Sequence, residues 1–226
     1  MATSGTATFN LDVNEIIEDA YEMAGLGRAF SGNDYRTARR SLNMLSQDFA
    51  NRGVNLWTIR QGYVSLSIGT PEYDLPADVV SVLDHAIRES VDTTSQTDLA
   101  VTRMSIGEYA GITNKLTRGR PTMIYVERRV SAPRVTLWPV PDKSTYRLVY
   151  WSIRRIEDSV NGSDTQFDAP TRFLPAIVSG LAYQLALKNP QTTERVPLLK
   201  QVFEEDFNRA AAEDRDRSDF RIVPAL

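Results

Sequence analysis

Two stretches near the start of the chain repeat apolar side chains at the three- and four-residue spacing of an amphipathic helix. The first begins after Asp12, which has Glu15 three residues later in a capping-box pattern, and it ends near Gly25. The second extends from about Asp34 to Arg52. Because only a short turn separates the two stretches, the sequence predicts an antiparallel αα-hairpin.

The middle of the chain changes to the two-residue period of β-strands. Val64, Leu66 and Ile68 alternate with a tyrosine and two serines, which predicts a half-buried strand. Two further strands around the sequence "SAP" at 131–133 predict a hairpin. The segment 146–153 carries large apolar side chains on both faces, so we expect it to be buried on both sides, with Trp151 in the core.

Helical spacing returns in the last third of the chain. One apolar face extends from Phe173 to Leu185, with Asp168 or Thr171 as the expected helix cap. A final amphipathic helix is predicted from about Thr193 to Arg215. The N-terminal and C-terminal pairs of helices each need an apolar partner face, and they can supply it to each other.

The order of these elements predicts an α+β fold. In this fold the N- and C-terminal helices form a helical bundle, which carries an inserted antiparallel β-rich domain and an extended C-terminal arm. The expected boundaries are 1–58 for the N-terminal helical hairpin, 59–156 for the inserted domain, 157–215 for the C-terminal helices and 216–226 for the arm.

The last residues of the sequence, "AAAEDRDRSDFRIVPAL" (210–226), contain the end of the last predicted helix and the arm, and they change from a charged run to a largely apolar one. Chain ends fray most readily when they are polar, so apolar side chains here predict a contact. Two contacts are consistent with the residues. The segment either folds back onto its own domain or docks onto another chain.

The composition argues against several classes of protein. The chain has 226 residues, 42% of them hydrophobic, with no cysteine and a single histidine, His85, in a predicted strand. The chain therefore lacks the residues that disulfides, thiolate catalysis and soft-metal sites require. There is also no glycine-rich phosphate loop and no EF-hand pattern. We predict a protein that is not an enzyme and that has no cofactor and no metal.

The same sequence predicts no targeting or membrane segment. The first residues lack the basic start and apolar run of a signal peptide. No apolar run approaches the roughly 20 residues that a membrane-spanning helix needs. We expect a soluble intracellular product without a membrane anchor.

Charge is distributed unevenly, although the net charge is only -3. The segment Arg103–Arg155 contains eleven lysines and arginines against three acidic residues. Arg118, Arg120, Arg128 and Arg129 are its candidate phosphate contacts. An alternative is that basic residues on edge strands only prevent aggregation. A nucleic-acid-binding module that uses this basic β-rich segment is the alternative function.

Two tryptophans are candidate interface residues, because tryptophan is enriched among the side chains that dominate binding energy. Trp57 follows a predicted helix end, and Trp138 lies at the end of a predicted strand.

Several stretches together resemble the head-to-tail adaptor proteins of short-tailed bacteriophages, also called tail tubular A-type or tail accessory proteins. The resemblance is one of ordered pattern over nearly the whole chain. The stretches that carry it are "NEIIEDAYEMAGL", "ARRSLNMLSQDFANRGVNLW", "YDLPADVVSVLDHAIR", "GRPTMIYVERR", "LWPVPDKSTYRLVYWSIRRIED", "FDAPTRFLPAIVSGLAYQLALKNP" and "DRDRSDFRIVP". The chain departs from the minimal members of that family in having a larger β-rich insert.

The resemblance implies a structural virion protein at the head–tail junction, assembled in the host cytoplasm. It implies a homo-oligomeric, dodecameric ring around an open channel, through which DNA passes without sequence-specific binding. The implied partners are the portal protein, the tail nozzle protein and tail fibres or spikes. It also implies that the C-terminal arm docks onto the portal or a neighbouring subunit through Phe220, Arg221, Ile222, Val223, Pro224 and Leu226.

Overall fold

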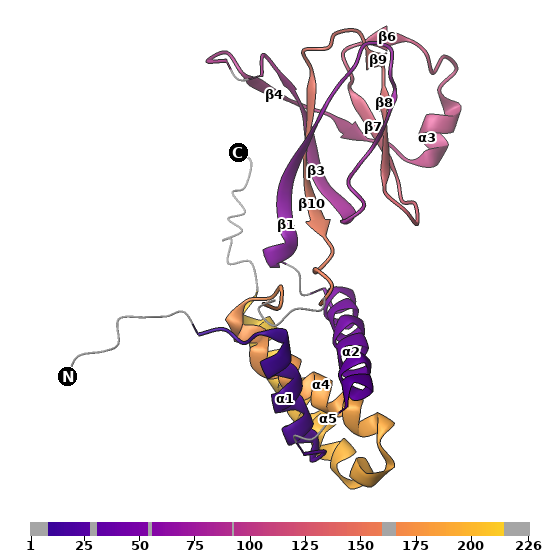
Figure 1. Cartoon of the computed structure of the whole chain (residues 1–226). Coiled ribbons are helices and arrows are strands. Elements are labelled where there is room, and N and C mark those ends of the chain that lie inside the picture. The colour runs from indigo at the N-terminus through magenta and orange to yellow at the C-terminus, as the bar shows by residue number, and fades with distance from the viewer. Residues whose placement is uncertain (1–8, 28–30, 54–55, 92, 160–165, 215–226) are drawn as a thin grey trace, which may run out of the picture. The chain divides into compact units, whose positions relative to one another are not determined.

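The computed structural model describes residues 9–27, 31–53, 56–91, 93–159 and 166–214. The chain divides into two compact units. Met1–Trp57 and Ile156–Leu226 form the first, here called the helical unit, and Thr58–Arg155 forms the second, here called the β unit. Helices and sheets are both present (Figure 1), so the predicted α+β fold class is confirmed.

The helical unit contains four α-helices and two short 3₁₀ segments within the described residues. They are α1 (Val13–Ala24), α2 (Gly32–Asn51), η2 (Thr171–Phe173), α4 (Leu174–Lys188), η3 (Pro190–Arg195) and α5 (Val196–Glu213).

Both N-terminal helices start with a capping box, in which a side chain and a backbone N–H are satisfied reciprocally. In α1 the Asp12 carboxylate accepts from the Glu15 N–H, as predicted from the sequence. In α2 the corresponding pair is Ser31 and Asp34, so this helix starts two residues before the predicted Asp34. The sequence prediction missed Ser31 as a cap.

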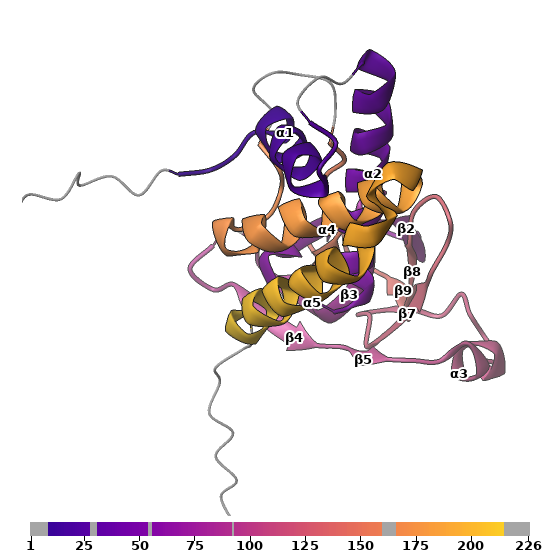
Figure 2. The same cartoon turned by 90° about the horizontal axis from the view of Figure 1, so that it is seen from below.

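The helix α4 is the centre of the helical unit. It packs against α1, α2 and α5, whereas α1 and α2 contact each other little; Figure 2 shows α4 between α1 and α5. Most residues of α4 itself are apolar or small, which is the composition expected of a helix that its neighbours cover on most of its surface. Its core residues include Ile177 and Leu181, both fully buried, and they share one cluster with Leu42, Phe49 and residues of α5.

The predicted cap of the third helical segment is wrong. Neither Asp168 nor Thr171 caps a helix by its side chain, because the chain enters α4 through the 3₁₀ turn η2. Pro175 lies at the start of α4, where the missing N–H of proline costs nothing. The last helix, α5, likewise begins at Val196, after the 3₁₀ segment η3, rather than at Thr193.

A single arginine connects the end of α2 with α5. The guanidinium of Arg52 donates to the Glu204 carboxylate at 2.9 and 3.1 Å and to Asp48 at 2.9 Å. The same guanidinium lies over the rings of Phe203 and Phe207, 5.0 and 4.7 Å from their centroids. Arginine suits this position because its planar group pairs with carboxylates in its plane and stacks on rings with its face.

The β unit contains three sheets within the described residues. Their orders are β1-β10-β3-β4, β2-β8-β7-β5 and β6-β9. The strands are β1 (Ile59–Ser65), β2 (Glu72–Asp74), β3 (Val79–Glu89), β4 (Thr97–Ala100), β5 (Thr102–Arg103), β6 (Arg118–Gly119), β7 (Met123–Glu127), β8 (Arg134–Trp138), β9 (Val140–Pro141) and β10 (Arg147–Arg154). The short helix α3 (Ile106–Gly111) completes the elements of this unit, and the 3₁₀ turn η1 (Leu56–Thr58) spans the point in the sequence at which the helical unit ends and the β unit begins.

Most strand pairs are antiparallel, as predicted, and β7 and β8 form the expected hairpin. Two pairs differ from the prediction, since β5 and β7, and also β6 and β9, run parallel. Parallel neighbours need a crossover connection. The segment with α3 provides one between β5 and β7. The capping pattern of Ser105 and Glu108 predicts this short helix, but the sequence pattern did not reveal the parallel pairing.

The two four-stranded sheets share one core, to which β3 and β10 of one sheet and β7 and β8 of the other contribute. Leu148 and Tyr150 of β10 face this core and are buried. On the other face of β10, Val149 is buried, but Trp151 and Ile153 are only half-buried. The expectation that both faces are covered, with Trp151 in the core, is therefore wrong.

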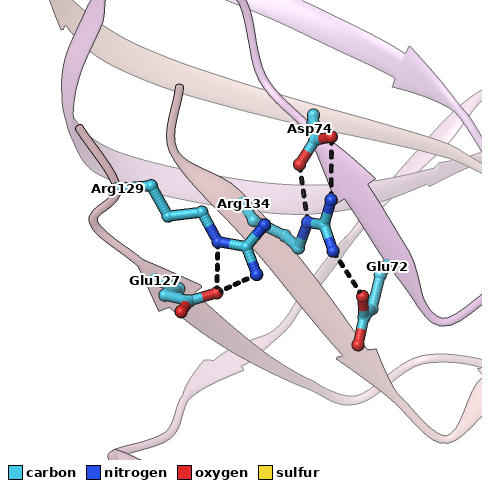
Figure 3. A network of polar contacts seen from close by, with 5 residues as sticks. All are labelled: Glu72, Asp74, Glu127, Arg129 and Arg134. Carbon is cyan, nitrogen blue, oxygen red and sulfur yellow. Dashed lines mark hydrogen bonds and ion pairs between the residues drawn. The ribbon is translucent and has the colours of Figure 1, made fainter. Parts of the chain in front are cut away.

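Charged pairs cross the strands of the second sheet (Figure 3). Arg134 on β8 binds both carboxylate oxygens of Asp74 on β2, at 2.6 and 2.9 Å, and binds Glu72 at 2.8 Å. A second pair does not cross strands: Arg129 binds Glu127, the last residue of β7, at 2.7 Å. The hydrogen bonds from Arg134 lower the pKa of Asp74 below its ordinary value. These pairs neutralise part of the basic segment at the edge of the sheet.

Gly180 of α4 tests how tightly the core of the helical unit is packed. A Cβ atom at this position would lie 2.8 Å from Cε2 of Phe203 and 3.0 Å from Cδ2 of Leu45. Gly180→Val should therefore lower the free energy of unfolding by about 2–3 kcal/mol, because a filled core must shift to accept the new atoms. Chemical denaturation measures this change.

The matched control is Gly32→Val in the first turn of α2, where an added Cβ meets nothing within 4 Å. This variant should stay within about 0.5 kcal/mol of the original chain. Equal stability of the two variants would contradict the close packing of α4 on α5.

His85 on β3 gives the β unit a predicted dependence on pH. Its pKa is lowered, mainly by burial, with a smaller opposing effect of Asp84. The unfolded chain therefore takes up a proton at a higher pH than the folded one. The contribution of His85 to stability is complete above the unfolded pKa of about 6.5 and is lost as the pH falls below it.

Replacing His85 with glutamine should remove this contribution. We expect His85→Gln to lose less stability than the original chain when the pH falls from about 7.5 to about 5. Urea denaturation at several pH values measures how the free energy of unfolding changes with pH. The carboxylates are the same in both chains, so the difference between the chains is due to His85. The same change in the free energy of unfolding with pH in both chains would contradict the assignment of this pH dependence to His85.

Candidate functional site

The segment 215–226, which contains Phe220, Arg221, Ile222, Val223, Pro224 and Leu226, lies outside the described residues. The described chain ends at Asp214, directly after α5. The side chain of Asp214 is only 2% exposed and pairs with Arg172 of η2. This ion pair fixes the point on the helical unit from which the segment departs.

An apolar groove lies close to this point, on the surface formed by α1, α4 and α5. It has a volume of about 440 Å³. Its lining residues come from all three helices, from η2 and from the chain before α1: Phe9, Leu11, Asp19, Met23, Thr171, Leu174, Pro175, Val178, Ser179 and Asp206. The groove can take up apolar side chains, because six of its ten lining residues are apolar.

The sequence analysis did not identify this groove. The sequence predicts the apolar faces of the separate helices, and Val178 belongs to the predicted face of the third helical segment. Only the packing of α1 and α5 against α4 leaves Val178 and Pro175 partly uncovered between them.

Trp57 lies at the edge of the helical core. Its indole Nε1 donates to the backbone carbonyl of Asp168 at 3.2 Å, and its ring is 4.9 Å from that of Phe173. The Asp168 carboxylate accepts from the backbone N–H of Glu157 at 3.0 Å. Trp57 is half-buried, so it has a structural role here, and its role as an interface residue stays a prediction.

Trp138, at the end of β8, is also half-buried. Its indole donates to the backbone carbonyl of Asn114 at 3.0 Å, which ties β8 to the segment after α3. In that segment Leu116 is 75% exposed. Tryptophan and exposed apolar side chains are both found at interaction surfaces, and the interface role of Trp138 likewise stays a prediction.

The four candidate arginines do not form one site. Arg118 and Arg120 precede β7, whereas Arg128 and Arg129 follow it, and a five-residue strand spans roughly 17 Å. Arg129 binds Glu127, and Arg128 donates to the Ser81 hydroxyl at 3.2 Å. Arg118 and Arg120 are exposed and make no ion pair within the described part of the chain.

The unit as a whole is less basic than the segment Arg103–Arg155. Thr58–Arg155 contains thirteen lysines and arginines against ten acidic residues, a formal charge of +3. Acidic residues of β2 and β3 lie earlier in the sequence but in the same unit, and some pair directly with the basic segment, as Asp74 does with Arg134. The helical unit is acidic by comparison, with a formal charge of -6.

Two further features bear on the class of protein. Among the described residues, no group of three or more His, Cys, Asp or Glu side chains is placed to hold a metal ion. None of the helices in the described ranges has the length and apolar character needed to cross a membrane.

Comparison with known proteins places the chain in a family. No curated protein matches its sequence. The family model described as SU10 adaptor protein matches residues 13–225, which include both units and nearly all of the segment after α5. This match agrees with the resemblance to phage head-to-tail adaptors. The chain belongs to the SU10 adaptor protein family.

Proposed function

We propose that this protein forms a ring-shaped head-to-tail adaptor between the portal and the tail nozzle of a bacteriophage virion. The observation that carries the proposal is the family match over residues 13–225. The ring, twelve-fold by the resemblance to head-to-tail adaptors, surrounds a channel for DNA, and it provides attachment for the tail and its fibres or spikes.

The mechanism of such a protein is assembly. The apolar residues Phe220, Ile222 and Val223 would enter a groove on the portal or on a neighbouring subunit, and Pro224 would lower the entropic cost of ordering the arm. Each large apolar side chain that becomes buried contributes roughly 1.5–3 kcal/mol. Repetition around a ring multiplies these contributions through avidity.

The charge distribution is consistent with a passive channel. The helical unit is acidic, and acidic walls repel a polyanion instead of holding it. In the β unit the candidate phosphate contacts are split between the two ends of β7. These features favour an adaptor over the alternative of a nucleic-acid-binding module.

Binding to the portal tests the role of the arm. Full-length chain should add to the portal protein of the same phage as a ring, whereas a chain that ends at Asp216 should not. The triple variant Phe220→Ala, Ile222→Ala, Val223→Ala should fail in the same way, because the anchors are lost. Native mass spectrometry of the mixtures measures the copy number.

A matched triple variant in the charged spacer, Asp216→Ala, Ser218→Ala, Asp219→Ala, should still assemble. Without portal the chain should stay monomeric, since docking supplies the free energy for ring formation. Rings of the chain alone at low concentration would contradict this order of assembly. Equal binding of the full-length and shortened chains would show that the arm is not an anchor.

DNA binding tests the alternative function. A variant with Arg118, Arg120, Arg128 and Arg129 all replaced by glutamine should bind duplex DNA as weakly as the original chain. Fluorescence anisotropy at several salt concentrations measures both affinities. A strong, salt-dependent affinity that only the original chain shows would instead favour a nucleic-acid-binding module.

A further inference from the structure

The groove on α1, α4 and α5 has the properties of a binding site for an apolar peptide. Its volume of about 440 Å³ lies in the range of about 300–1,000 Å³ that is usual for ligand sites. Phe9, at its rim, is 73% exposed, and Val178 and Met23 are only partly covered. An apolar surface of this kind gains free energy when a second apolar surface covers it.

Two carboxylates at this groove favour a ligand that also carries a positive charge. Asp19 on α1 is exposed and makes no ion pair within the described ranges. The side chain of Asp206 on α5 is only 15% exposed, and its nearest cation, on Arg209, is 3.5 Å away. A ligand that fits the groove therefore combines several apolar side chains with one positive charge.

The segment 220–226 of this chain has that combination. Phe220, Ile222, Val223 and Leu226 are apolar, and Arg221 is the single charged residue among them. An arginine pairs well with carboxylates because its guanidinium presents several donors in one plane.

The segment also starts within reach of the groove. A smaller cleft of about 150 Å³ lies between Arg172 and Glu213, and it shares Pro175 and Asp206 with the groove. Along α5, Asp206 and Glu213 are seven residues apart in sequence, which is about 10 Å along the helix axis. The five residues from Arg215 to Asp219 span up to roughly 17 Å when extended, which is enough to lead the chain back to the groove.

We infer that, in the free protein, Phe220–Leu226 of the same chain occupies the groove between α1, α4 and α5, with Arg221 facing Asp19 and Asp206. The same chain is favoured over a second copy because a short linker gives an effective concentration on the order of millimolar. The inference concerns the isolated subunit and does not depend on the proposed role in the virion. If that role is also correct, the arm must leave this groove to dock elsewhere.

A spin label on the segment tests this contact in the full-length chain. The sequence has no cysteine, so Ala225→Cys creates a unique attachment site. Of the methionines, Met23 lines the groove, whereas Met44, Met104 and Met123 do not. In NMR spectra of methyl-labelled methionine, the label should broaden the Met23 signal strongly and the signals of Met44, Met104 and Met123 little.

A mixed sample distinguishes the two sources of the segment. Spin-labelled chain without isotopes is combined with isotope-labelled chain that has no spin label. Broadening of Met23 only when both labels are on one molecule is the expected result. Broadening in the mixed sample would overturn the inference in favour of exchange between copies, and unbroadened Met23 in both samples would overturn occupancy of the groove.

Charge reversal at the groove provides a matched pair of variants. Asp19→Lys should lower the ratio of bound to free segment about two- to fivefold, the effect expected of an exposed ion pair. Glu18→Lys makes the same change on the preceding residue of α1, which is exposed and does not line the groove, and it should leave the ratio unchanged. Equal effects of both variants would argue against the contact between Arg221 and Asp19.

Changes in the segment avoid any risk to the fold of the helical unit. Ile222→Asp should abolish the broadening of Met23, because it replaces an apolar anchor with a negative charge that the apolar surface and the carboxylates of the groove both disfavour. Ser218→Asp changes the spacer by the same charge and should retain the broadening. Retained broadening in Ile222→Asp would overturn the inference.

Discussion

The packing around α4 is the constraint on which the helical unit depends. This helix is covered by α1, α2 and α5, so nearly every turn of it must carry an apolar or small residue. Gly180 shows how close the neighbours come, since the ring of Phe203 occupies the space of a Cβ. The N- and C-terminal parts of the sequence therefore form one core, although the whole β unit lies between them in the chain.

The same packing creates the surface with the clearest capacity for binding. Helices of unequal length and direction cannot cover α4 evenly, and the uncovered part of α4 at Pro175 and Val178 becomes the floor of the apolar groove. The ion pair of Arg172 with Asp214 then fixes the departure of the segment after α5 near this groove. In an adaptor, such a segment could bind either this groove or an apolar site on another chain. Assembly would then shift the segment from the first site to the second.

The β unit illustrates why local charge counts are unreliable guides to binding. The segment Arg103–Arg155 is strongly basic, but β2 and β3 precede it in the sequence and bring carboxylates to the same sheets. Asp74 binds Arg134 through both of its oxygens (Figure 3). Strand pairing decides which charged side chains lie next to each other. Because the unit Thr58–Arg155 includes these earlier acidic residues, its formal charge is only +3.

The sequence by itself determined the α+β class, the approximate extent of the long helices and the β7–β8 hairpin, because hydrophobic period and capping residues such as Asp12 and Glu15 act locally. Tertiary structure decided the rest. The parallel pairing of β5 with β7, the half-burial of Trp151 and the groove beside Val178 all depend on contacts between segments distant in the chain. Periodicity shows which face of an element is apolar, but only packing shows how much of that face a partner covers.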